Sequence, residues 1–135
     1  MLDGRSLQKA PRMKLREPAL RLTPDPDGSE SFVHVVIEGD TGRGVVRREH
    51  ARGLAAGHFP GDPFLPGAFV VELMATLAER IAAPARVRGI VRCAFARRVP
   101  PDAEIAVTAR LAGGLAQTRL EVGGKAAAHA TLRLA

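Results

Sequence analysis

The 135-residue sequence contains no tryptophan or tyrosine and a single cysteine, Cys93. One cysteine excludes an internal disulfide and any zinc site built from several cysteines, and it is typical of a reducing compartment such as the cytoplasm. The sequence has no run of about 18 uncharged apolar residues, so it predicts no transmembrane helix. Residues 1–5 include an acid and no apolar run, unlike a secretory signal. We therefore expect a cytoplasmic protein that does not enter a membrane.

Acidic residues are scarce in the second half of the chain. The net charge is +6, and residues 68–135 account for most of it with 10 basic and 5 acidic side chains. Residues 86–98 contain five arginines and no acidic residue, and we call these arginines the arginine stripe: Arg86, Arg88, Arg92, Arg97 and Arg98. Nucleic acid is a poor match for it, because tryptophan and tyrosine are absent and the five phenylalanines do not alternate with the arginines as base stacking requires. The stripe predicts either a solvated surface or a docking site for an acidic protein.

The chain is predicted to consist of an N-terminal segment and one domain. Four prolines interrupt residues 1–30, which we expect to form an extended N-terminal segment with at most a short strand at 19–22. Residues 31–135 have the length and apolar content of a single domain. No internal repeat is visible.

The first half of this domain predicts a strand pair, an irregular segment and a helix. Residues 32–37 are rich in β-branched side chains and predict a strand, with a return strand beginning at 44–47. Residues 51–67 hold four glycines and three prolines and predict an irregular, function-bearing loop. Residues 68–83 predict a helix that is apolar around most of its circumference and therefore buried, ended by Pro84.

Turn signals then recur about every ten residues. Pro100 to Asp102, Gly113-Gly114 and Gly123-Gly124 separate four β-rich segments, the last running from about 126 to 134. Strands joined by short Gly-Gly turns predict an antiparallel meander. The expected fold class is α+β, with an antiparallel sheet wrapped around a long central helix.

The segment from Gly57 to Gly67 and the helix that follows it hold the residues of greatest chemical interest. Three prolines and three glycines give a loop that is stiff in places and free in others, able to hold the imidazole of His58 in one place. The loop leads into a helix N-terminus, whose N–H groups suit a carbonyl oxygen that gains negative charge. Glu72 lies among apolar neighbours, which favour a protonated carboxyl. Together they form a general acid–base set.

Each of these residues also has a purely structural interpretation. A single histidine in a Gly/Pro loop is commonly structural, and a glutamate on an apolar helix commonly reaches solvent or pairs with an arginine. The remaining histidines (His34, His50 and His129) have no metal-ligand spacing, so no metal site is expected. Cys93 has no evident base beside it, which argues against a nucleophile.

The joint pattern resembles a known signature. Residues 58–67 read HFPGDPFLPG and residues 72–75 read ELMA, so that Glu72 follows His58 by 14 positions. This arrangement is similar to that of the 3-hydroxyacyl-[acyl-carrier-protein] dehydratases, enzymes of fatty-acid synthesis with the hot-dog fold. A weaker similarity follows at Gly89-Ile90 and at 95–101, so that the resemblance covers about residues 30–134.

The resemblance implies dehydration of a (3R)-hydroxyacyl thioester on acyl carrier protein to the trans-2-enoyl product, without a cofactor or metal. It implies that His58 removes the α-proton, that Glu72 assists departure of the hydroxyl, and that the N–H of Gly67 polarises the thioester oxygen. It also implies a homodimer, or a larger dimer-based assembly, in which each site combines the histidine of one protomer with the acid of the other. Binding of substrate or carrier protein is assigned to Phe59, Pro66, Arg92, Arg97 and Arg98.

Two departures from the family pattern matter. Residues 18–22 match the N-terminal part of the family poorly, and the branch that also isomerises the double bond carries Asp at the position of Glu72, so isomerase activity is not predicted. Two alternatives remain open. One is an acyl-thioester hydrolase on the same fold, and the other is a non-catalytic acyl-binding or scaffolding subunit that pairs with an active partner.

Overall fold

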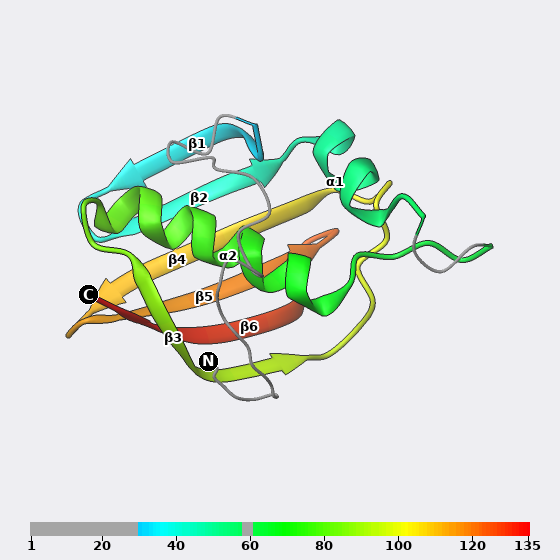
Figure 1. The fold of residues 1–135 in the computed structure, drawn as a ribbon. Coiled ribbons are helices and arrows are strands. Elements are labelled where there is room, and N and C mark those ends of the chain that lie inside the picture. The colour runs from blue at the N-terminus through cyan, green and yellow to red at the C-terminus, as the bar shows by residue number, and fades with distance from the viewer. Residues whose placement is uncertain (1–29, 58–60) are drawn as a thin grey trace.

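The computed structural model describes residues 30–57 and 61–135. In this part of the chain, six strands form one antiparallel sheet in the order β1-β2-β4-β5-β6-β3 (Figure 1). The strands are β1 (Phe32–Glu38), β2 (Thr41–Val46), β3 (Val87–Phe95), β4 (Ile105–Ala112), β5 (Leu115–Val122) and β6 (Lys125–Leu134). The predicted N-terminal segment and the short strand at 19–22 lie outside the described residues, apart from position 30.

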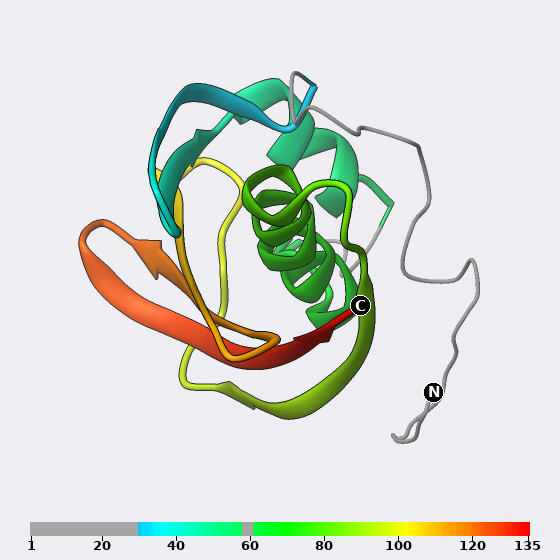
Figure 2. The same ribbon diagram turned by 90° about the vertical axis from the view of Figure 1, so that its left-hand side faces the viewer.

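The long helix α2 (Gly67–Ala82) lies on the concave face of the curved sheet, as the view along its axis shows (Figure 2). The predicted helix at 68–83 is therefore confirmed to within one residue at each end. Its sheet-facing side chains are almost completely removed from solvent, and the largest of them are Val70, Leu73, Met74 and Leu77. Burial of this apolar helix is the main source of the core.

The predicted meander is confirmed in β4, β5 and β6. Glycine pairs make the two connections, and Gly113 and Gly114 adopt φ values of +59° and +80°, which a two-residue hairpin turn requires and glycine adopts without strain. Side chains alternate along β5, where Ala116, Thr118 and Leu120 are buried against α2 and the residues between them are exposed. This two-residue period places one face of the sheet on the helix.

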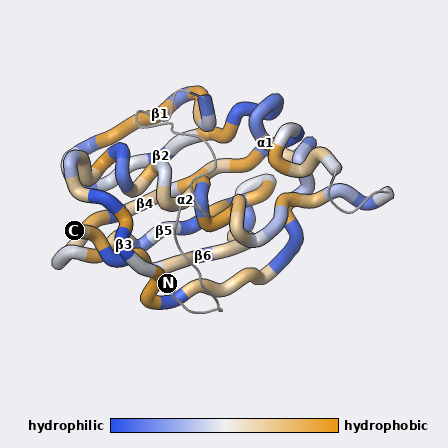
Figure 3. Tube along the Cα trace, in the orientation of Figure 1, coloured by the Kyte–Doolittle hydropathy of each residue, from blue (hydrophilic) through white to orange (hydrophobic). Residues whose placement is uncertain are grey.

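A second helix, α1 (Arg48–Ala55), corrects the prediction of an irregular segment from residue 51. It is eight residues long, and Ala51, Leu54 and Ala55 share its inner face, with Ala51 and Ala55 buried and Leu54 partly buried. The helix is too short, with Gly53 in its interior, for this period to stand out in the sequence. The hydropathy-coloured trace shows the mixture of polar and apolar residues in α1 (Figure 3). β2 also begins at Thr41, three residues earlier than predicted, because the turn at Gly39-Asp40 is tighter than expected.

β3 departs from sequential order. It does not pair with β4, the next strand along the chain, but lies at the edge of the sheet and pairs with β6, with Ile90 opposite Leu132. Its other edge carries no strand within the described residues. Val91 and Phe95 are 58% and 53% exposed there, which is unusual for large apolar side chains at a sheet edge.

Neither described helix is both long and apolar enough to cross a membrane.

Candidate active site

The structure describes six of the eight residues predicted to form the site. Gly67 and Glu72 lie on α2, Pro66 immediately precedes it, and the three arginines lie on β3 or after it. His58 and Phe59 lie outside the described residues. The described part of the site is therefore the start of α2 with its acid, and the surfaces next to it.

Pro66 is the N-cap of α2 and forms no side-chain capping bond. Its carbonyl oxygen accepts hydrogen bonds from Phe69 N–H at 3.0 Å and from Val70 N–H at 3.2 Å. Gly67, the first helical residue, is exposed. Because no cap side chain covers the first turn, its N–H groups and the positive end of the helix dipole are directed at whatever binds there. Such a site stabilises an oxygen that becomes negative during reaction.

The ring of Phe95 lies beside this helix start. A Cβ atom placed on Gly67 would be 3.1 Å from Cζ of Phe95, which is closer than ordinary van der Waals contact. A side chain at position 67 would therefore push the ring aside. Glycine at this position leaves the backbone of the helix start accessible beside the ring of Phe95, the last residue of β3.

Glu72 follows Gly67 by five residues, which corresponds to about 7.5 Å along a helix axis. It lies between the buried residues Val71 and Leu73, its side chain is partly buried, and its Oε1 atom is shielded from solvent. This confirms the prediction that Glu72 lies among apolar neighbours on a helix. A carboxyl group with one oxygen removed from bulk water can exchange a proton with a bound molecule in preference to solvent.

The segment between the undescribed residues and α2, residues 61–66, is attached to the chain that follows β3. Arg98 Nη1 donates a hydrogen bond of 2.5 Å to Asp62 Oδ2, and the guanidinium carbon lies 4.4 Å from the centre of the Phe64 ring. Leu65 N–H donates to the carbonyl oxygen of Val99 at 2.9 Å. The sequence prediction placed Arg98 on a docking surface and did not foresee these contacts.

The arginine stripe is not uniform in the structure. Arg86 forms a 3.2 Å ion pair with Glu79 of α2, and Arg98 is paired with Asp62. Within residues 30–57 and 61–135, no ion pair is recorded for Arg88, Arg92 or Arg97, which are exposed. These three arginines keep their positive charge available to an anionic partner.

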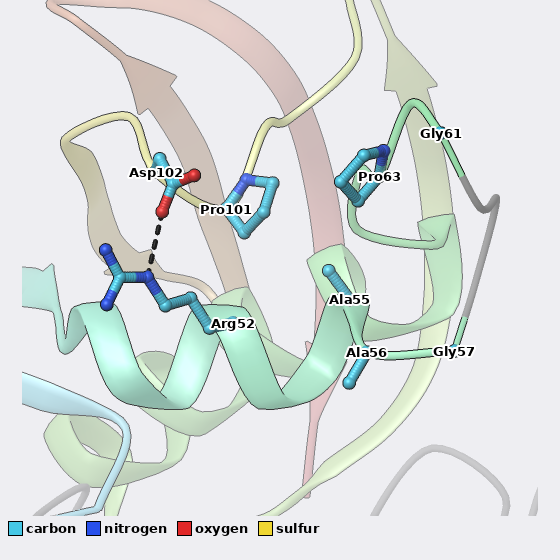
Figure 4. Close-up of a pocket in the computed structure, with 8 residues that line it drawn as sticks. All are labelled: Arg52, Ala55, Ala56, Gly57, Gly61, Pro63, Pro101 and Asp102. Atoms are coloured by element: carbon cyan, nitrogen blue, oxygen red, sulfur yellow. Dashed lines mark hydrogen bonds and ion pairs between the residues drawn. The ribbon is translucent and has the colours of Figure 1, made fainter.

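A shallow pocket of about 380 Å³ lies elsewhere, between the end of α1 and the loop that precedes β4 (Figure 4). Arg52 and Asp102 form a 2.8 Å ion pair at one side of it, and Pro63 and Pro101 line another. None of the described residues predicted for the site lines this pocket. It shares Gly57, Gly61 and Pro63 with the segment that leads into α2.

Two further points from the sequence concern Cys93 and metal binding. Burial raises the pKa of the Cys93 thiol to about 11, which agrees with the prediction that it is no nucleophile. In the described part of the chain, no three side chains of the metal-binding types come together.

Comparisons with known proteins agree with this arrangement. The sequence model of one protein family, described as "ApeI-like: ApeI dehydratase", matches residues 45–132. No curated protein sequence matches the chain.

Among solved structures, one similar to this chain is the dehydratase heterocomplex ApeI:P from Xenorhabdus doucetiae, with a TM-score of 0.68 and 17% identity over 76% of this chain and 95% of that one. An uncharacterized protein from Erwinia carotovora subsp. atroseptica has a TM-score of 0.60 and 16% identity over 75% and 89% of the two chains. An HP0420 homologue from Helicobacter felis has a TM-score of 0.60 and 10% identity over 87% and 98%. These likenesses and the sheet topology confirm the predicted hot-dog fold.

Proposed function

The chain belongs to the ApeI-like dehydratase family, and from that premise we propose that it is a hydro-lyase that dehydrates (3R)-hydroxyacyl thioesters on acyl carrier protein to trans-2-enoyl thioesters. The observation that carries this proposal is the position of Glu72. Its carboxyl group is partly buried on the same helix whose uncapped N-terminus begins five residues earlier. An acid and an oxyanion donor on one rigid element are what an elimination beside a thioester carbonyl needs.

The proposed reaction breaks a C–H bond at C2 and a C–O bond at C3, and forms the double bond between them. His58 takes the proton from C2, while the N–H of Gly67 stabilises negative charge on the thioester oxygen. The protonated carboxyl of Glu72 gives its proton to the departing hydroxyl, and water leaves. Positioned proton transfer contributes roughly 10²–10⁴-fold to such a rate, and one oxyanion donor roughly 10²–10³-fold.

We propose that the working unit is a dimer in which His58 of one protomer faces Glu72 of the other. The uncovered edge of β3, with Val91 and Phe95 exposed, supports an interface there. Phe95 also lies against Gly67, so a partner on this edge would lie next to the proposed oxyanion site. Such a position suits a site completed by two chains.

Carrier protein is the proposed source of the acyl chain. Arg92 and Arg97 are exposed and without a recorded ion pair in the described residues, and together with Arg98 they form the proposed docking surface for an acidic carrier. Pro66 at the helix start and Phe59 are proposed to contact the acyl thioester itself. The electrostatic part of such docking weakens as salt is added.

One observation favours a second candidate function. The similar structure from Xenorhabdus doucetiae is a heterocomplex, so this chain could be one subunit of a mixed dimer in which a different chain completes the active site. Such a protein alone would bind carrier protein and process no thioester.

The test follows enoyl formation from a 3-hydroxyacyl carrier-protein thioester by the purified protein. We expect turnover by the wild type, a loss of about 10²-fold or more in His58→Ala and in Glu72→Gln, and wild-type turnover in Glu104→Gln. Glu104 is an exposed glutamate before β4 and serves as the matched control.

Three results would contradict the assignment. Equal turnover by the wild type and His58→Ala would remove the role given to His58. Release of free thiol without enoyl product would identify a hydrolase. Carrier binding without any turnover would favour the subunit of a mixed dimer.

A further inference from the structure

Arg98 makes two contacts at once with the loop that leads into α2. Its guanidinium donates to Asp62 and also lies over the face of Phe64, two residues further along the same loop. A planar guanidinium can do both, because its edge donates hydrogen bonds while its face stacks on an aromatic ring. The bond to Asp62 joins positions 36 residues apart in the sequence.

A third contact extends this attachment toward the helix. Leu65 N–H donates to Val99 O at 2.9 Å, and both side chains are buried. Arg98 and Val99 are adjacent, so one short stretch of chain holds Asp62, Phe64 and Leu65 in turn. Pro66 and Gly67 follow immediately, and they begin α2.

We propose that Arg98 is a positioning residue, which fixes the loop of residues 61–66 and through it the start of α2 on which the thioester oxygen is bound. This inference rests on the proposed function, and it gives Arg98 a role besides carrier docking. Gly61 has φ +88° and its neighbours Asp62 and Pro63 are exposed, so the loop has little burial of its own at this end. The contacts of Arg98 with Asp62 and Phe64 hold this end of the loop in place, which burial does not do.

The two possible roles of Arg98 predict different kinetics. A docking arginine affects the KM for the carrier-bound substrate and becomes unimportant with a small thioester that has no carrier. A positioning arginine affects kcat with either substrate, since a small displacement of the groups that bind the reacting atoms slows the chemical step.

The experiment measures kcat and KM, with a 3-hydroxyacyl N-acetylcysteamine thioester and with the carrier-bound substrate, for Arg98→Gln, Arg98→Lys, Asp62→Asn and Phe64→Leu. The matched control is Arg119→Gln, which removes an arginine of comparable exposure from its 3.2 Å ion pair with Glu121 on β5. We expect Arg98→Gln to lower kcat about tenfold with KM changed less than about twofold, and Arg98→Lys to recover most of it. Asp62→Asn and Phe64→Leu should each show part of the loss, and Arg119→Gln none.

Hydrogen exchange supplies a readout that does not depend on turnover. If Arg98 holds the loop, the amide of Leu65 should exchange about tenfold faster in Arg98→Gln than in the wild type or in Arg119→Gln. The rest of α2 should keep its protection, which separates loop release from unfolding.

Unchanged exchange in Arg98→Gln would overturn the proposal, as would faster exchange with unchanged kcat on the small thioester. A rise in KM seen only with carrier-bound substrate would leave Arg98 as a docking residue and would also overturn it. If the wild type dehydrates no thioester, the proposed function fails, and the exchange measurement alone still shows whether Arg98 holds the loop.

Discussion

Cys93 lies on β3, next to the exposed Arg92, yet its thiol is held in its neutral form. Burial raises its pKa from 9.0 to about 11. At pH 8 the thiolate fraction is then lower by about 100-fold, and the thiolate is the reactive form. We expect Cys93 in the folded protein to react with iodoacetamide about 100-fold more slowly than in the urea-unfolded chain at the same pH.

The same shift has a consequence for stability. Because the pKa is higher in the folded than in the unfolded chain, the stabilising contribution of the neutral thiol is complete below about pH 9 and is lost as the pH rises toward 11. Cys93→Ala should lack this loss in urea titrations. Equal alkylation rates in folded and unfolded protein would contradict the burial of the thiol.

Among the elements, α2 holds both the core and the proposed chemistry. Leu77 is fully buried on its sheet-facing side, nearly three turns away from the helix start at Gly67. Leu77→Ala should lower the free energy of unfolding by about 2–5 kcal/mol, since the cavity adds to the lost burial. Urea denaturation measures this change, with Arg80→Ala on the partly exposed side of the same helix as the control. A loss below about 1 kcal/mol would mean that the helix does not pack against the sheet as described.

How far the elements could be predicted from sequence depended on how local their signals are. Gly113-Gly114 and the apolar run of α2 act over a few neighbours, so the meander and the long helix were predicted correctly. α1 was missed because it is only eight residues long and contains Gly53, so the helical spacing of Ala51, Leu54 and Ala55 spans little more than one turn. The pairing of β3 with β6 has no local signal at all, since the partner strand lies far along the chain.

The candidate site shows the same division. The place of Glu72 on an apolar helix could be predicted because its apolar neighbours are adjacent in sequence, and the helix start because Pro66-Gly67 marks it; their catalytic roles stay predictions. The contacts of Arg98 with Asp62 and Phe64 could not be predicted, because only the folded course of β3 brings the residue after that strand back to the loop before α2.

At the scale of the whole molecule, the uncovered edge of β3 is the interface of the proposed dimer. Val91 is 58% exposed in the single chain, so Val91→Glu should change the stability of an isolated protomer by no more than about 0.5 kcal/mol. In a dimer formed along this edge, the same change buries an unpaired charge. We expect light scattering to show monomers for Val91→Glu and dimers for the wild type, with dehydratase turnover lost along with the dimer.

Val36→Glu is the matched control, since Val36 is 60% exposed on β1, at the opposite edge of the sheet. A dimer that survives Val91→Glu and dissociates with Val36→Glu would place the interface on the wrong edge. A wild-type monomer that dimerises only with a second kind of chain would favour the mixed assembly.

The order of strands also decides when β3 can gain its neighbour. β3 precedes β4 and β5 in the chain, yet the strand to which it bonds is β6, the last one. Both edges of β3 therefore stay bare until the C-terminal strand is available. Arg88 and Arg92 on β3 oppose its pairing with other chains in that interval, because charged side chains protect bare strand edges.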